Sequence, residues 1–230
     1  MKIFISFFIL FIAISTLSYA GKLQMEGSQF DLSAASTTTC KNKTGNIHGF
    51  IEREMGWSYG GFDIPISGAK VTLDDLHRNF SDSTETNSDG YFKFCDLETS
   101  YYLVTANKKG YDTAKYVLPF QRREKGLNYN YYPPEDASMQ LYKKGKSPEK
   151  NSKITCSLIA IREDIENIKV TLKGMQTKYK VNLTTDTGLI SEFDDLKADT
   201  YLLTAKKGRK TKTKRIKLEK NMIYQFYIQW

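Results

Sequence analysis

The fold is decided by residues 68–111, which read GAKVTLDDLHRNFSDSTETNSDGYFKFCDLETSYYLVTANKKGY. Apolar residues recur at every second position over 70–73 (Val71 and Leu73) and again over 101–106 (Tyr102, Val104 and Ala106), as in strands that bury one face. Between these runs, the Asp89-Gly90 step supplies the positive φ that a tight turn needs. The stretch therefore predicts β-strands joined by short turns.

The pattern returns, in altered form, about a hundred residues further along the chain. Residues 168–172 repeat the opening strand, 185–188 the turn, 195–196 an Asp-Leu step, and 200–205 the Tyr-rich strand. Solenoid repeats are much shorter than this period, so the sequence predicts two tandem β domains, each with its own core. The residues expected to be buried are Val71, Phe92, Phe94, Tyr102, Val104 and Ala106 in the first core, and Val170, Leu172, Tyr201, Leu203 and Ala205 in the second.

A set of glycines, aromatic residues and strand residues in the first copy forms a family pattern. Its members are Gly49, Ile66, Ser67, Gly68, Ala69, Lys70, Val71, Thr86, Asp89, Gly90, Tyr91, Phe92, Leu97, Tyr102, Gly110 and Tyr111. These residues resemble the carboxypeptidase regulatory-like domain, a transthyretin-like (prealbumin-like) β-sandwich. The second copy resembles it in degenerate form, because it lacks the Gly-Ala step, has Leu189 where an aromatic residue is usual, and has Arg209 near the closing position. The resemblance implies an all-β fold of two tandem sandwiches of about seven strands each, and it implies no particular activity.

The start of the chain has the features of a secretory signal peptide over residues 1–20. Lys2 precedes an apolar run over 3–17, and small residues precede a cut after Ala20. An uncleaved membrane anchor is the alternative, although the run is short for a bilayer. The remaining segments are a polar leader (21–43), the first sandwich (44–143), a polar linker (144–152) and the second sandwich (153–230). We therefore expect a secreted, periplasmic or cell-surface protein.

The first copy contains two loops that the second copy lacks. Residues 55–63 place Trp57, Tyr59 and Phe62 around two glycines, and aromatic side chains on such a loop can stack on a sugar or contact a partner. The alternative is that they cap the core of the sandwich. The connection 120–136 is longer than most loops of compact domains, as functional or disordered connections often are.

Positive charge is concentrated in the second copy. The chain has a formal net charge of +8, and residues 153–230 hold 16 Lys and Arg against 9 Asp and Glu, whereas the charges of 21–152 cancel. The anion-binding candidates lie in one hairpin-like stretch and are Lys206, Lys207, Arg209, Lys210, Lys212, Lys214 and Arg215. Such a local potential suits an anionic polysaccharide, an envelope polymer or a lipid surface. A lysine-rich edge strand that opposes aggregation is the alternative. We expect no nucleic acid partner, because the chain is expected to be exported and carries no nucleic-acid-binding motif.

Three cysteines in an exported chain permit one internal disulfide. The alternation over 154–158 directs Cys156 into the second core, which makes Cys40–Cys95 the preferred bridge, and the other pairings stay open. Three asparagines, Asn42, Asn79 and Asn182, satisfy the N-glycosylation rule. They are acceptors only in a cell that glycosylates exported proteins, and the sequence does not indicate which kind of cell produces the chain.

Neither histidine lies in a catalytic or metal-binding motif. His48 and His77 have no second nitrogen or thiol at zinc-site spacing, and no serine lies in a nucleophile elbow. The acidic pairs at 74–75 and 194–195 are typical of solvated turns at strand ends. We therefore expect no enzyme activity, no metal and no cofactor.

The sequence as a whole predicts an exported, non-catalytic binding or structural protein. Its two sandwiches would display loops to an extracytoplasmic protein or glycan. A carbohydrate-binding or anionic-polymer-binding module is the alternative interpretation, and an accessory subunit of a secreted enzyme is a third.

Overall fold

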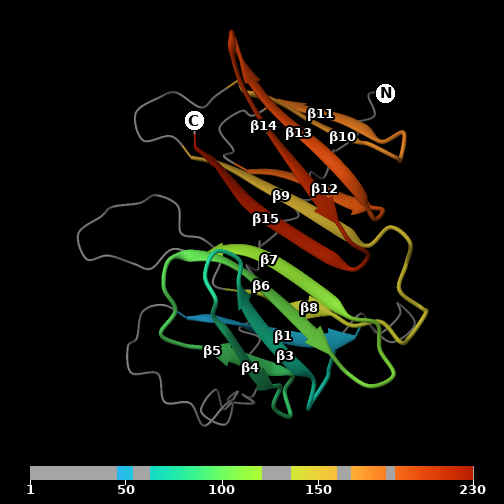
Figure 1. Cartoon of the computed structure of the whole chain (residues 1–230). Helices are drawn as coiled ribbons and strands as arrows, with labels where there is room; N and C mark the ends of the chain where they lie inside the picture. Colours follow the sequence, from blue (N-terminus) through green and yellow to red (C-terminus); the bar gives the residue numbers. More distant parts are fainter. Residues whose placement is uncertain (1–45, 54–62, 121–135, 160–166, 185–189, 230) are drawn as a thin grey trace, which may run out of the picture. The chain divides into compact units, whose positions relative to one another are not determined.

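The computed structural model describes residues 46–53, 63–120, 136–159, 167–184 and 190–229. All regular secondary structure in this part of the chain is β-strand, so the all-β prediction is confirmed (Figure 1). No helix among the residues described is long and apolar enough to cross a membrane. The predicted signal peptide and polar leader lie outside these residues and stay predictions.

The strands of the first half are β1 (Ile47–Arg53), β2 (Ile64–Pro65), β3 (Lys70–Asp75), β4 (Ser81–Glu85), β5 (Tyr91–Phe94), β6 (Ser100–Asn107), β7 (Ala114–Phe120) and β8 (Met139–Gln140). Those of the second half are β9 (Ser152–Ile159), β10 (Lys169–Gly174), β11 (Lys180–Thr184), β12 (Ile190–Leu196), β13 (Asp199–Lys207), β14 (Lys210–Leu218) and β15 (Met222–Gln229). The predicted turn before β5 is present, and Gly90 has a φ of 72° there.

The two halves have the same strand order. In the first half, β4-β3-β6-β7 forms one layer, and β1 with its neighbours β5 and β8 belongs to the other. In the second half, β11-β10-β13-β14 forms one layer, and β9 with its neighbours β12 and β15 belongs to the other. The pairing of β1 with β8 is parallel, and so is the pairing of β9 with β15. Each strand of the second half from β9 to β15 therefore has a topological counterpart in the first.

Two hydrophobic cores are present, one in each half. All the residues that the sequence predicts to be buried are buried, and they separate between the two clusters as expected. The largest fully buried side chains include Tyr102, Phe92 and Phe94 in the first core and Tyr201 and Phe226 in the second. Burial of each such side chain adds about 1.5–3 kcal/mol to the free energy of unfolding.

The two halves also share a sheet, which the sequence analysis did not anticipate. Strand β15 pairs in parallel with β7, with Met222 opposite Lys115 and Tyr224 opposite Val117. A seven-stranded sheet, β12-β9-β15-β7-β6-β3-β4, therefore runs through both halves (Figure 1). Leu118 belongs to the first core and its neighbour Val117 to the second, so the two cores contact opposite faces of this sheet.

Polar contacts accompany the pairing of β7 with β15. Lys115 forms an ion pair with Glu219 at 2.6 Å, and the hydroxyl of Tyr116 lies 3.1 Å from the side-chain oxygen of Gln225. The side-chain nitrogen of Asn221 donates to the carbonyl of Thr113 at 3.2 Å. These contacts join residues about a hundred positions apart, so they depend on both halves being folded.

The segment predicted to be a polar linker is hydrogen-bonded to the first half. The backbone N–H groups of Gly145 and Ser147 donate to the carboxylate of Asp112, at 3.0 and 3.4 Å. The hydrogen bond from Gly145 is the main reason why the pKa of Asp112 lies below its usual range. The connection from β8 to β9 is therefore held in place at this point.

Candidate functional site

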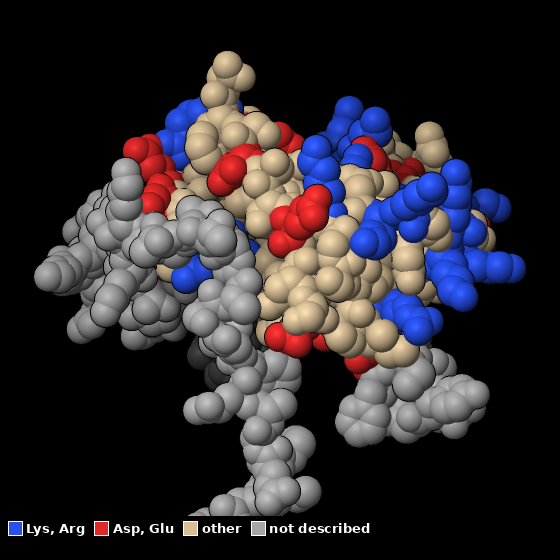
Figure 2. Space-filling model, turned by 90° about the horizontal axis from the view of Figure 1, so that it is seen from below, with Lys and Arg blue, Asp and Glu red and all other residues tan. Residues whose placement is uncertain are grey.

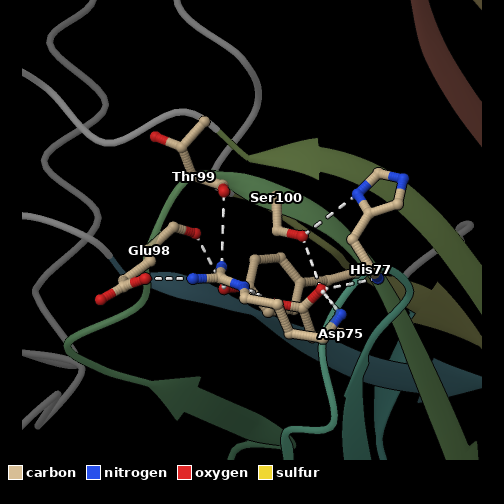
Figure 3. Close-up of polar contacts among 7 residues, drawn as sticks. Asp75, His77, Glu98, Thr99 and Ser100 are labelled. Atoms are coloured by element: carbon tan, nitrogen blue, oxygen red, sulfur yellow. Dashed lines mark hydrogen bonds and ion pairs between the residues drawn. The ribbon is translucent and has the colours of Figure 1, made fainter.

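A polar cluster at the end of β3 brings together three residue types that hydrolases use (Figure 3). The hydroxyl of Ser100 donates to Asp75 Oδ1 at 2.6 Å, and it lies 3.5 Å from His77 Nδ1. Asp75 also accepts from the Arg78 Nε at 2.7 Å. Burial alone would raise the pKa of Asp75, but the hydrogen bonds from Ser100, His77 and Arg78 outweigh it and hold the pKa below its usual range. The cluster therefore contains a buried, ionised carboxylate.

The order of these contacts differs from that of a catalytic triad. In a triad the serine donates to the histidine, and the histidine donates to the carboxylate. Here Ser100 donates to Asp75 directly, and Asp75 accepts from the backbone N–H of His77 at 2.9 Å. Ser100 is also buried. The hydroxyl of Ser100 is therefore held as a hydrogen-bond donor to an ionised carboxylate and is not prepared for attack.

The second half has an equivalent cluster without histidine or serine. Asp199 accepts from the backbone N–H groups of Gln176 and Thr177, at 3.1 and 2.8 Å. Burial would raise the pKa of Asp199. The hydrogen bonds from Thr177, which have the largest lowering effect, and from Gln176 hold this pKa below its usual range. Both clusters fix the loop that follows the equivalent strands β3 and β10. A structural role in anchoring these loops accounts for both.

The aromatic and glycosylation candidates lie either outside the described residues or at exposed positions. Trp57, Tyr59 and Phe62 lie outside the described residues, as does Asn42, so their predicted roles stay predictions. Asn79 is exposed after β3, and Asn182 is exposed on β11. Both positions are accessible to modification.

The cysteines have different environments. Cys95 is disulfide-bonded, whereas Cys156 is a free, buried thiol. Burial raises the pKa of Cys156 to about 12, so it stays protonated and inert at neutral pH. Cys40, the predicted partner of Cys95, lies outside the described residues, and the pairing stays a prediction.

The basic candidates belong to a ribbon formed by β13 and β14, and the ribbon has two distinct faces. Leu203, Ala205 and Ile216 point into the second core, and Lys207, Lys210, Lys212 and Lys214 continue that face by alternation. Lys206 and Arg215 point the other way, and Arg209 lies in the turn. The seven candidates therefore do not form one surface.

Lys214 is distinct from the other candidates because it is half-buried. Its Nζ lies 4.8 Å from the ring centroid of Phe226, 5.2 Å from that of Tyr101 and 5.9 Å from that of Tyr224. Burial lowers the pKa of Lys214. Its ammonium therefore contacts aromatic faces within the protein and is not presented to a ligand.

The outer face of β11-β10-β13-β14, which points away from the second core, carries the more continuous set of cations. Its charged members are Lys169, Lys173, Lys180, Lys206, Arg215 and Lys217, and all six are exposed. None of them forms an ion pair with another residue in the described part of the chain. The single carboxylate in these four strands is Asp199, which is buried. We call this surface the basic face.

Like charges stand directly opposite each other on the basic face. Lys169 pairs in register with Lys206, and Lys173 pairs in register with Lys180. Like charges at opposed positions of neighbouring strands are destabilising. Lys169, Lys173 and Lys180 were not among the sequence candidates, because only strand pairing brings them beside the ribbon. The available signal was the alternation of Lys169 and Lys173 with Val170 and Leu172, and of Lys180 with Val181.

A second group of lysines lies at the connection between the halves. The backbone N–H of Lys144 donates to the carbonyl of Gly110 at 2.8 Å, which places residues 143–146 beside the turn from β6 to β7. Figure 2 shows Lys and Arg side chains gathered toward the right, the side on which these segments lie in Figure 1. Lys143, Lys144 and Lys146, here called the connection lysines, are exposed. Lys144 lies near the carboxylate of Asp112 and contributes to lowering its pKa.

Two cavities lie among the described residues. One has a volume of 310 Å³ and is lined by polar and apolar residues of both halves, among them Glu52, Lys115 and Ile223. The other has a volume of 270 Å³ and lies beside Arg78, Phe80 and the Asp75 cluster. Within the described ranges no group of three or more His, Cys, Asp or Glu side chains is arranged to hold a metal ion.

Residues 61–126 match the family model of the carboxypeptidase regulatory-like domain. This match spans β2 to β7 and confirms the resemblance expected for the first copy. No curated protein matches the sequence. The second copy lies outside the family match, and the prediction that it is a degenerate copy stays a prediction.

Several solved structures are similar to the chain, among them two pilins. They include the TIE protein of Bacillus anthracis, with 15% identity and a TM-score of 0.31 over 80% of this chain and 34% of that one. The minor pilin of Streptococcus agalactiae has 10% identity and a TM-score of 0.30, over 80% and 94% of the two chains. The streptococcal ancillary pilin has 9% identity and a TM-score of 0.27, over 83% and 63%. The chain thus spans about a third of the TIE protein.

Proposed function

We propose that this protein is a non-catalytic binding protein that acts outside the cytoplasm and binds anionic polymers through its second half. The observation that carries the proposal is the set of cations on β10, β11, β13 and β14, whose single carboxylate, Asp199, is buried. A local positive potential of this kind attracts polyanions and raises their association rate. Export rests on the signal-peptide features of residues 1–20.

Two features of the described residues support a non-catalytic role. The Ser100 hydroxyl is held by Asp75, so the cluster that contains hydrolase residue types has a structural arrangement. The equivalent position in the second half is again an anchor, built on Asp199. Similar loop anchoring in both halves accounts for these polar residues without a reaction.

The test uses the full chain without residues 1–20 on immobilised heparin, with an uncharged dextran matrix for comparison. We expect retention on heparin at low ionic strength, elution by moderate salt, and no retention on dextran, because the attraction between exposed charges is screened over about 8 Å at physiological salt. Absence of retention on heparin would contradict the proposal.

A pair of variants with equal loss of charge separates a local surface from the net charge. Lys169→Ser/Lys206→Ser/Lys217→Ser removes three charges from the basic face of the second half, and Lys143→Ser/Lys144→Ser/Lys146→Ser removes three connection lysines. We expect the first variant to elute at clearly lower salt and the second to elute near the wild type. Equal shifts would show that retention follows total charge alone, which would also contradict the proposal.

A further inference from the structure

The basic face has an ordered layout that the positions of the charges along the sequence do not reveal. Registers of the four strands align its outward side chains in rows that run across the sheet. One row contains Lys169 and Lys206, and another contains Lys180, Lys173 and Arg215. Successive rows lie two residues apart along each strand, or about 6.6–6.8 Å.

The row between the two cationic rows is uncharged and rich in hydroxyl groups. It consists of Asn182, Thr171, Thr204 and Thr213, one from each strand. Thr204 and Thr213 stand directly opposite each other, and Thr171 donates to Asn182 Oδ1 at 2.8 Å. Neighbouring strands are about 4.8 Å apart, so this row offers a polar side chain at about that spacing across the sheet.

We infer that the basic face binds a linear anionic polysaccharide that lies across the strands along the threonine row. This inference rests on the proposed function and names the surface and the ligand class. A polymer in this position meets hydroxyl donors beneath it, with Lys206 on one side and Lys173 and Arg215 on the other. Both kinds of contact suit a chain whose sulfate, carboxylate or phosphate groups alternate with hydroxyl groups.

The composition of the face favours a polysaccharide over the other polyanions. Single-stranded nucleic acids bind on aromatic stacking platforms, and no outward residue of the four strands is aromatic. Peripheral binding to lipid needs several apolar side chains that enter the bilayer interface. Within the four strands Leu202 is the single large apolar residue on this face, and it is half-buried, while the exposed Met175 follows the end of β10. A surface made mainly of cations and hydroxyl groups matches neither.

The inward face of the ribbon is a poorer candidate surface. Lys214 is held over three aromatic rings, and Lys207, Lys210 and Lys212 already have contacts within the chain. The six cations of the basic face have no such ion pairs among the described residues. A ligand can therefore engage them without displacing an ion-pair partner in the part of the chain that the structure describes.

The charge test compares two variants of the full chain without residues 1–20. Lys173→Ser/Lys180→Ser/Arg215→Ser changes the basic face, and Lys207→Ser/Lys210→Ser/Lys212→Ser changes the inward face, with the same loss of charge. Affinity for heparin is measured by titration over a series of salt concentrations. We expect the first variant to lose at least tenfold in affinity and to have a shallower salt dependence, because each lost ionic contact reduces the slope. We expect the second to lose less than threefold.

The hydroxyl test removes no charge. In Thr204→Val/Thr213→Val the isosteric side chains suit a strand, so the fold is retained. We expect a several-fold loss of affinity for heparin with an unchanged salt slope, since the number of ionic contacts is the same. A titration with anionic phosphatidylglycerol vesicles serves as the alternative ligand, and for this double variant we expect no change there.

Each outcome decides a separate point. A larger loss from the inward variant than from the basic-face variant overturns the inference, while heparin binding by the wild type keeps the proposed function. Unchanged heparin affinity in the threonine variant, or stronger binding to vesicles than to heparin, overturns the polysaccharide assignment. Failure of the wild type to bind heparin at all overturns the proposed function itself.

Discussion

The blocks β4-β3-β6-β7 and β11-β10-β13-β14 have the same strand order and use their outer faces in opposite ways. On the first block Tyr101, Leu103 and Val117 pack against the second core, and β7 is an inner strand because β15 pairs with it. On the second block the outer face carries lysines and threonines, and β14 is an edge strand. The outer face of the first block is therefore part of the contact between the two halves, whereas the outer face of the second block is exposed to solvent.

The difference shows that topology alone does not decide which surfaces are available for binding. Strand β7 needs apolar side chains on both faces, because each face contacts a different core. Strand β14 needs residues that prevent edge-to-edge pairing, and lysines do this. Because those lysines also create a positive potential, a feature that protects the edge is available for anion binding as well.

The largest loss of stability is expected when β7 receives a lysine, a residue type that β14 carries at several positions. Val117→Lys places a charge in the second core without a partner, which costs about 3–5 kcal/mol of unfolding free energy. Urea denaturation of the full chain measures the loss. Thr105→Lys, at a half-exposed outward position of β6, is the control and should change the unfolding free energy by less than about 0.5 kcal/mol. A small effect of Val117→Lys would mean that β7 is not covered by the second half.

The loop anchors allow a second comparison, because the carboxylate comes from different strands. Register places Asp75 opposite Tyr102 and Gly174 opposite Tyr201, so Asp75 with Ser100 corresponds to Gly174 with Asp199. A side chain at Gly174 would clash with the hydroxyl of Thr177 and would also meet Asp199 Oδ2 at 2.8 Å. The acid and the small residue have therefore exchanged places between the halves, while the loop N–H groups that they satisfy are equivalent.

Exchange of these residues tests the equivalence of the two anchors. Gly174→Asp adds a carboxylate beside Asp199, and Asp199→Ser removes the acceptor of buried N–H groups, so each should cost about 1–3 kcal/mol. The double variant recreates the arrangement of the first half. We expect it to be more stable, in urea denaturation, than the sum of the single losses predicts. Strict additivity would contradict the equivalence.

Acid should weaken both anchors together, with a smaller effect than either substitution. The pKa values of Asp75 and Asp199 are below their usual range in the folded protein, because hydrogen bonds outweigh the opposing effect of burial. Unfolded chains therefore take up protons first as the pH falls below about 4, and the unfolding free energy declines there. The contribution of Asp75 and Asp199 to the unfolding free energy should be constant between about pH 5 and 7. Asp199→Asn should flatten the decline measured by denaturation, and an identical pH profile would contradict this role.

The smallest effect is expected where β14 contacts the covered face of the first block. Lys214→Ala removes an ammonium and its aliphatic chain from three aromatic rings, with an expected loss of about 0.5–1 kcal/mol. The exposed neighbour on the same strand face provides the comparison, and Lys212→Ala should lower the melting temperature less than Lys214→Ala does. Equal effects would indicate that the rings do not stabilise Lys214.

Local patterns predicted the parts of the fold that depend on one strand at a time. The alternation over 101–106 and 200–205 identified the buried positions of both cores, and the Asp89-Gly90 step identified a turn. The parallel pairing of β15 with β7 was not predicted, since it joins distant residues and leaves no periodic signal. The signal that the sequence offered for a strand buried on both faces was the apolar run over 116–120, and it was not used.

The sequence predicted which residue types form the candidate site and did not predict how they are arranged. The charge count placed the excess of positive charge in the second half, but the lysines and arginines of the ribbon were assigned to one surface. Strand alternation separates Lys206 from Lys207, and strand pairing adds Lys169, Lys173 and Lys180. Lys214 was grouped with the exposed lysines, because a sequence does not show that three aromatic rings lie under one ammonium.

The pairing of β7 with β15 has a consequence for how the chain folds. Strand β15 is synthesised after all the other strands described here, and parallel contacts between such distant segments form slowly. Until β15 arrives, β7 presents both an open hydrogen-bonding edge and an apolar face that includes Val117. Intermediates with these features aggregate readily. The lysines of β14 protect the edge of the finished molecule, whereas the edge of β7 is covered by β15 once the second half is complete.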